Sequence, residues 1–203
     1  VKQNAMHAIR GNHDHGVAQQ VKVQGKNGFK YLTGVTREVT QERITADDRR
    51  FLSALPVSKR VTLDGVKFLL VHATPRDPLD EYVMEGSAAT ASIDALATPL
   101  GFHGHTHIPA YWCARDGAAI GLPIGVDAVD ALPRSYVNPG SVGQPRDRDP
   151  RAAYLLWTPG GDGETSFGTL RWRRIDYEID RTVAAMEAVQ LPQGLRDRLY
   201  AGR

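Results

Sequence analysis

The sequence predicts a layered α/β fold in a single domain that spans residues 1–203. Strand-like and helix-like segments are mixed along the chain, and its polar motifs follow apparent strands, as in folds whose functional site lies at the strand ends. The composition is globular, with 41% hydrophobic and 24% charged residues. No repeat, low-complexity tract or domain linker divides the sequence, so one domain is expected.

The first third of the chain predicts one short strand and one helix. Residues 5–10 are read as a strand that ends at the Gly11 turn, whereas residues 16–40 have few periodic apolar positions and are read as irregular. Residues 45–48 are typical of a capping box, so we expect an amphipathic helix that ends at Pro56.

The middle third predicts a hairpin followed by a helix. Asp64-Gly65 stands between two strand-like runs in residues 60–71, which is a strong signal for a two-residue hairpin turn. Residues 68–71 are apolar without alternation, so the second strand of the hairpin should be central and covered on both faces. Alanines and the spacing of the larger apolar residues predict a helix over residues 87–97.

The last third predicts strands at residues 135–137, 152–157 and 170–179, and a terminal helix at residues 181–190. The strand at 170–179 alternates polar and apolar residues and contains Trp172. Such a strand forms either a sheet edge that pairs between subunits of a homo-oligomer or a buried face of a sandwich, and the sequence leaves both open.

Charge and composition exclude several classes of protein. With 25 Lys and Arg against 23 Asp and Glu, the net charge of +2 is too even to indicate sequence-specific nucleic-acid binding, which leaves small anionic substrates as partners. No apolar stretch approaches the roughly 18 residues of a membrane helix and the start lacks a signal-peptide pattern, so we expect a cytoplasmic protein without membrane contacts. The single cysteine, Cys113, follows Tyr111 and Trp112 and is predicted to be a buried strand residue.

The most informative motif is the Gly-His-Thr-His run at positions 104–107. Two histidines at positions i and i+2 of an extended segment project to the same side, so both imidazoles could face one metal cluster. Histidine pairs are also common on surfaces, and this pair gains weight from Asn12 and His72, which also follow apparent strands. The amide oxygen of Asn12 and the imidazole nitrogens of His72, His105 and His107 together suit Mn, Fe, Zn or Ni.

A second motif, Gly-Asn-His-Asp at positions 11–14, predicts two separate roles. In an extended backbone the adjacent side chains of Asn12 and His13 point to opposite sides, so Asn12 would hold metal while His13 faces the substrate. An imidazole with a pKa of about 6.5 can protonate a departing alkoxide at neutral pH. Asp14 either orients His13 or accepts backbone hydrogen bonds in the turn, and we favour the second; the simplest alternative for the whole motif is a capped turn.

Two arginines are candidates for substrate contacts. Arg76 and Arg146 each lie in a proline-containing loop near a motif, and a guanidinium can bind a phosphate through two parallel hydrogen bonds. Arg76 is the first candidate, ahead of Arg146, and ordinary surface exposure is the alternative for both. The remaining histidines are expected to be structural or solvent-facing, namely His7, His15 and His103.

These motifs resemble those of the calcineurin-like metallophosphoesterase superfamily, and more closely its YfcE-like branch of small bacterial phosphodiesterases. The matching segments are Gly-Asn-His-Asp at 11–14, Val-His-Ala at 71–73 followed by Pro-Arg-Asp-Pro at 75–78, Gly-His-Thr-His at 104–107, and Asn-Pro-Gly-Ser-Val-Gly at 138–143. Their order and rough spacing agree with the family from about residue 5 to about residue 179. The resemblance implies a four-layer α/β/β/α sandwich of two mixed sheets flanked by helices.

The resemblance also implies a site with two divalent metal ions. Asn12, His72 and His105 would bind one ion, His107 would bind the other, and His13 would act on the leaving group. Manganese is the first expectation, with iron, zinc or nickel as alternatives. The implied reaction is hydrolysis of a small phosphodiester or phosphomonoester by a metal-activated hydroxide.

The sequence departs from the family at its start. The family opens with an Asp-x-His motif and then a Gly-Asp motif, and neither occurs upstream of residue 11. We expect the natural chain to have roughly a strand, a helix and a second strand before Val1; a relative that has lost these motifs is the other interpretation. Two other functions therefore stay open, a non-catalytic metal- or nucleotide-binding module and a mononuclear zinc hydrolase with three histidine ligands.

Overall fold

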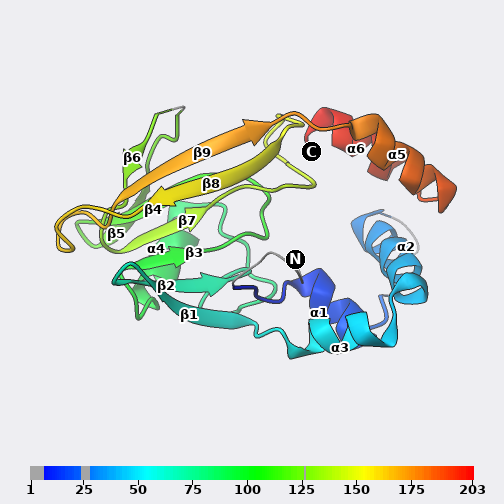
Figure 1. Cartoon of the computed structure of the whole chain (residues 1–203), viewed down its shortest axis with the longest axis horizontal. Coiled ribbons are helices and arrows are strands. Elements are labelled where there is room, and N and C mark those ends of the chain that lie inside the picture. The colour runs from blue at the N-terminus through cyan, green and yellow to red at the C-terminus, as the bar shows by residue number, and fades with distance from the viewer. Residues whose placement is uncertain (1–6, 24–27, 126) are drawn as a thin grey trace.

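Two β-sheets packed face to face form the centre of the molecule, and most of the helices lie toward one end of them (Figure 1). The computed structural model describes residues 7–23, 28–125 and 127–203. The strands are β1 (Ser58–Leu63), β2 (Val66–Val71), β3 (Leu100–Phe102), β4 (Ala110–Arg115), β5 (Ala118–Gly121), β6 (Val129–Asp130), β7 (Ser135–Asn138), β8 (Ala152–Thr158) and β9 (Thr169–Ile175). The helices are α1 (Asn12–Ala18), α2 (Gly28–Arg43), α3 (Ala46–Ala54), α4 (Gly86–Asp94), α5 (Ile179–Ala188) and α6 (Gln193–Ala201). None of these described helices is both long and apolar enough to cross a membrane.

The strand order brings the predicted motif loops to one edge of the larger sheet. This sheet has the order β1-β2-β3-β7-β4-β5 and is mixed, because β2, β3 and β7 run parallel while β1, β4 and β5 pair antiparallel. The carboxyl ends of parallel strands meet at the same edge, so the segments after β2, β3 and β7 lie together. In Figure 1 the arrows of β2 and β3 point toward α1, whose first residues belong to the 11–14 motif.

The predicted α/β fold, with a mixed sheet, a second sheet and flanking helices, is confirmed. The second sheet has the order β6-β9-β8, and both of its described pairings are antiparallel rather than mixed.

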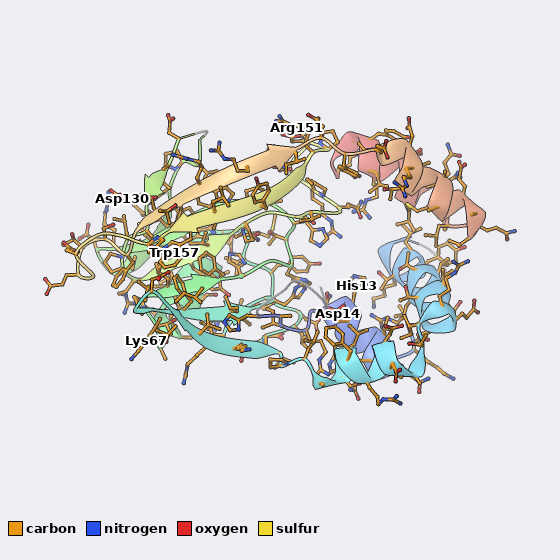
Figure 2. All side chains as sticks on the ribbon, in the orientation of Figure 1. His13, Asp14, Lys67, Asp130, Arg151 and Trp157 are labelled. Carbon is orange, nitrogen blue, oxygen red and sulfur yellow. The ribbon has the colours of Figure 1, made fainter. Side chains whose placement is uncertain are left out.

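The main core lies between the two sheets. Phe68 of β2 is 1% exposed and packs its ring edge-on against Trp157 of β8, with the ring centroids 4.8 Å apart. Figure 2 shows Trp157 in the space between the two sheets. On the other face of the larger sheet, α4 packs through Ile93 against Tyr136. The buried members of the inter-sheet cluster are Val61, Phe68, Leu100, Tyr111, Ala131, Val137, Leu170 and Trp172.

Local sequence signals are confirmed where the chain turns sharply. The β1–β2 hairpin turns at Asp64 and Gly65, whose φ angles of 46° and 80° are the two positive values that a type I′ turn requires. The predicted helix over residues 87–97 forms as α4, and the predicted strands at 135–137 and 152–157 form as β7 and β8.

Two buried residues test what the sequence predicted for their strands. Cys113 is a buried, unpaired thiol in β4, as predicted. Trp172 is 7% exposed and belongs to the inter-sheet cluster, so β9 is a buried face of the sandwich. The strand ends at Ile175 rather than residue 179, because α5 begins at Ile179.

Three predictions for helices and strands were wrong. Residues 16–18 and 28–40 are helical, in α1 and α2, and residues 24–27 lie outside the described residues. Helix α2 is largely polar, so its apolar periodicity is weak, and it packs against α1. Residues 8–10 form no strand, because the described part of the chain gives them a single backbone hydrogen bond, from Arg10 N to Pro56 O, instead of a strand partner. Residues 5 and 6 lie outside the described residues. Helix α6 was not predicted at all.

The N-terminus of α3 offers a test of the capping box. Thr45 Oγ accepts a hydrogen bond from Asp48 N (3.1 Å), and Asp48 Oδ2 accepts one from Thr45 N (3.0 Å). Thr45→Ala is expected to lower the free energy of unfolding by about 1 kcal/mol, because it leaves the Asp48 amide without its acceptor. Urea titration measures this loss, and Thr45→Ser should retain most of the stability. Equal stability of the alanine variant would show that the cap is not needed.

Candidate active site

Three side-chain nitrogen and oxygen atoms from distant parts of the chain converge at the edge of the larger sheet. Asn12 is the first residue of α1, His72 follows β2, and His105 lies in the loop after β3. His72 Nε2 is 3.1 Å from Asn12 Oδ1 and 3.0 Å from His105 Nδ1. The structure therefore brings together three of the four predicted metal ligands, across 93 residues of sequence, from position 12 to position 105.

Their hydrogen-bond partners fix which of these atoms carry protons. His105 Nε2 lies 3.0 Å from the Asp80 carbonyl oxygen, and since a carbonyl only accepts, Nε2 carries the proton and the neutral ring leaves Nδ1 with a lone pair. Asn12 Oδ1 accepts a hydrogen bond from the backbone N–H of His13 at 3.0 Å, which fixes the orientation of the amide. The three atoms therefore share at most one proton, on His72, and a cation would satisfy all three together.

His107 makes different contacts. Its Nδ1 lies 2.6 Å from the Gln144 carbonyl oxygen, so Nδ1 donates and the neutral ring keeps its lone pair on Nε2. His107 and His13 both line a cavity of about 620 Å³, and Arg146 lines it as well. The two histidines of the 104–107 motif thus face different surroundings, one the three-atom cluster and the other the cavity.

The backbone of this motif differs from the extended segment that the sequence predicted. His105 and His107 have φ angles of 62° and 61°, in the left-handed region, so the alternation of side chains in a strand does not apply. The buried side chain of Asn138 stabilises the loop, because its Nδ2 donates to Gly104 O and to Thr106 Oγ, each at 2.9 Å. This gives the 138–143 motif a structural role beside the site.

The 11–14 motif is also helical rather than extended. It begins α1, with Gly11 as the N-cap and the Asp14 carboxylate accepting a hydrogen bond from Gly11 N at 2.9 Å. The predicted backbone role of Asp14 is thus confirmed. A Cβ on Gly11 would lie 3.0 Å from His72 Nδ1, so glycine leaves room for the imidazole. Figure 2 shows His13 and Asp14 side by side on α1.

Burial lowers the pKa of all four motif histidines. The pKa of His72 falls to about 4, through burial first and then the charges of the neighbouring histidines. The pKa of His107 also falls to about 4, through burial and then the positive charge of Arg146. Burial is the largest cause for His13 and His105 as well. At neutral pH these imidazoles are uncharged, which is the form that binds a metal ion.

The donor chemistry fits a divalent metal ion. Two neutral imidazole nitrogens and one carboxamide oxygen form a mixed set that suits borderline ions such as Mn, Fe, Zn or Ni. Across residues 7–23, 28–125 and 127–203, no group of three or more His, Cys, Asp or Glu side chains could hold a metal ion. The cluster consequently depends on Asn12 as its third donor.

Of the two arginines that the sequence offered as substrate contacts, the second candidate, and not the first, lines the cavity. The Arg76 guanidinium forms an ion pair with Glu81, which also accepts a hydrogen bond from Thr74 Oγ. Arg146, the second candidate, lines the cavity with His13. Substrate binding by Arg76 stays a prediction, since Arg146 and not Arg76 lines the cavity with His13.

Several residues of the site were missed from the sequence. The ring of Tyr82 lies against that of His105, with the centroids 3.9 Å apart and the planes tilted by 33°, and Arg198 of α6 lines the cavity. Neither residue belongs to a motif, so no local signal marks it. His103, predicted to be structural or solvent-facing, is buried and stacks on Tyr136 at 4.2 Å.

Relatives of the chain carry the same fold. A family model described as the calcineurin-like phosphoesterase superfamily domain matches residues 1–160. The crystal structure of a metallophosphoesterase from Sphaerobacter thermophilus is 32% identical, with a TM-score of 0.77 over 96% of this chain and 76% of that one. The hypothetical protein PH1004 from Pyrococcus horikoshii OT3 is 19% identical, with a TM-score of 0.71 over 100% of this chain and 75% of its own, which shows the fold alone.

A relative found by sequence is matched over a similar share of both chains. The uncharacterized protein MJ0912 of Methanocaldococcus jannaschii is 29% identical over 202 residues, which cover 97% of this chain and 75% of that protein. None of these relatives tests the YfcE-like branch, which stays a prediction. Because the family model covers most of the sequence and the architecture agrees, the chain belongs to the calcineurin-like phosphoesterase superfamily.

Proposed function

We propose that this protein is a metal-dependent phosphoesterase that hydrolyses small phosphodiesters or phosphomonoesters. The proposal depends on the convergence of Asn12 Oδ1, His72 Nε2 and His105 Nδ1. His72 Nε2 lies 3.1 Å from the first of the other two atoms and 3.0 Å from the second, and at most one of the three atoms carries a proton. These residues would hold one divalent ion, and His107 Nε2 would contribute to a second. Manganese is the first ion to test.

Bound divalent ions would polarise the phosphate oxygens and lower the pKa of a water molecule. The residues of this chain supply the rest of the chemistry. Arg146 would bind and orient the phosphate from the cavity wall, and His13 would give a proton to the leaving oxygen as the bond to phosphorus breaks.

The electrostatics of His13 set a condition on this role. Burial, followed by the positive charges of Arg37 and Arg146, lowers the pKa of His13, whereas Asp14 and Asp80 raise it. A proton donor must be protonated before the reaction. The negative charge of a bound phosphate would offset the two arginines, so we propose that His13 takes up its proton together with the substrate.

His72→Ala is expected to abolish tight metal binding in the first site, because His72 Nε2 contacts both other donors. Bound manganese is measured by elemental analysis after gel filtration of the Mn²⁺-loaded protein. His15→Ala, on α1 but outside the donor set, is the matched control and should retain the wild-type metal content. Wild-type metal content in His72→Ala would contradict the site.

Hydrolysis of bis-p-nitrophenyl phosphate by the Mn²⁺-loaded protein, lost on chelation, tests the proposed reaction. Metal binding without hydrolysis of any phosphate ester would instead identify a non-catalytic metal-binding relative. One bound ion rather than two would support a mononuclear site.

A further inference from the structure

The cavity that His13 and His107 line is walled on its other sides by residues of three helices. Residues of α2, α5 and α6 line it together with the loop at 142–146, and its volume is about 620 Å³. Figure 1 shows α2 facing α5 and α6 across this end of the molecule. Segments far apart in sequence therefore build one cavity next to the proposed site of reaction.

One part of the cavity is positively charged. Arg146 and Arg198 both line it, and no Asp or Glu is among the described residues of its wall. Burial first, and then the charge of Arg146, lowers the pKa of Arg198, so the two guanidinium groups are close enough to repel each other. An anion between them would remove this repulsion and accept hydrogen bonds from both.

The remainder of the wall is largely apolar. Val142 is one of the residues that line the cavity, and 72% of its surface is exposed. Apolar surface that faces a cavity next to cationic groups is typical of a site for a ligand with one apolar end and one charged end. The apolar lining residues are Leu32, Val142, Tyr177, Met186, Leu195 and Leu199.

We infer that the cavity selects phosphate esters whose organic group is large and apolar, of about the size of a fused aromatic ring system. The phosphate would lie by His13, Arg146 and Arg198, and the organic group would lie between α2 and the α5–α6 pair. This inference rests on the proposed function, because it names the class of substrate for the same site.

Binding of two non-hydrolysable phosphonates tests the selection. Isothermal titration of the Mn²⁺-loaded protein with naphthylphosphonate and with methylphosphonate compares the same anion with and without a large apolar group. Naphthylphosphonate is expected to bind at least about tenfold more tightly, since even one methylene in an apolar pocket changes affinity by about that factor. Equal affinity, or no binding of either compound, would overturn the inference.

Matched variants on one helix locate the apolar group. Met186→Trp fills the cavity from α5 and should reduce the affinity for naphthylphosphonate by about tenfold or more while changing that for methylphosphonate little. Ala184→Trp places the same side chain at an exposed position of α5 outside the cavity, and should leave both affinities unchanged. Equal effects of the two variants would show that the apolar wall does not contact the ligand.

The charged end has its own variant. Arg198→Gln should weaken both phosphonates by a similar factor, whereas Arg181→Gln, an exposed arginine of α5 outside this cavity, should weaken neither. Selectivity for the naphthyl compound without hydrolysis of any ester would support the binding site and contradict the phosphoesterase activity. Hydrolysis without such selectivity would support the phosphoesterase activity and contradict the selection of an apolar organic group.

Discussion

His13→Ala is expected to lower the turnover number by roughly 10²–10⁴-fold, the usual contribution of a general acid. His13 lines the cavity, and its side chain makes none of the contacts within the three-donor cluster. The contact from position 13 to Asn12 Oδ1 is made by the backbone N–H, which alanine keeps. Metal content should therefore stay close to that of the wild type.

Turnover and bound manganese are measured on the same preparation. His15→Ala removes an imidazole from the same helix without touching the cavity, and should retain activity. A His13→Ala protein as active as the wild type would refute the proton-donor role. Loss of metal together with activity would show that His13 supports the metal site rather than the leaving group.

Phe68→Ala is expected to lower the free energy of unfolding by about 3–5 kcal/mol, the usual cost of deleting a buried phenyl ring and leaving a cavity. Phe68 is 1% exposed and contacts rings from both sheets, with centroids 4.8 Å from Trp157 and 5.4 Å from Phe102. The empty space cannot close easily, because the two sheets meet there.

Urea-induced unfolding followed by fluorescence measures the loss. Lys67→Ala, the exposed neighbour of Phe68 on β2, is the control and should change stability by less than about 0.5 kcal/mol. Its side chain is labelled in Figure 2 on the outer side of the hairpin. A similar loss for both variants would show that the loss does not come from removing the buried phenyl ring.

The elements that the sequence predicts correctly are those with a local cause. Asp64-Gly65 turns the hairpin because both positions need positive φ, and residues 45–48 begin α3 because two side chains cap it. Helix α2 lacks such a signal: its apolar residues are few, and it packs on α1. Tertiary packing of this kind is not visible in a window of sequence.

The residues of the site also fall into those that the sequence indicates and those that only the folded chain reveals. The residue types at 12, 72 and 105 indicate metal ligands, and the parallel strands of the larger sheet bring them together. His105 and His107 have a left-handed backbone, a conformation that usually marks glycine. Because neither residue is glycine, the sequence suggested an extended segment instead. Tyr82 and Arg198 reach the site only through loop and helix packing, which motifs do not record.

Anomalous diffraction at the manganese edge, from crystals of the Mn²⁺-loaded protein, tests the central claim most directly. We expect a peak within bonding distance of Asn12 Oδ1, His72 Nε2 and His105 Nδ1, and none there in crystals of His72→Ala. A peak bound by other residues, or a fully loaded protein with no peak between these three atoms, would contradict the account.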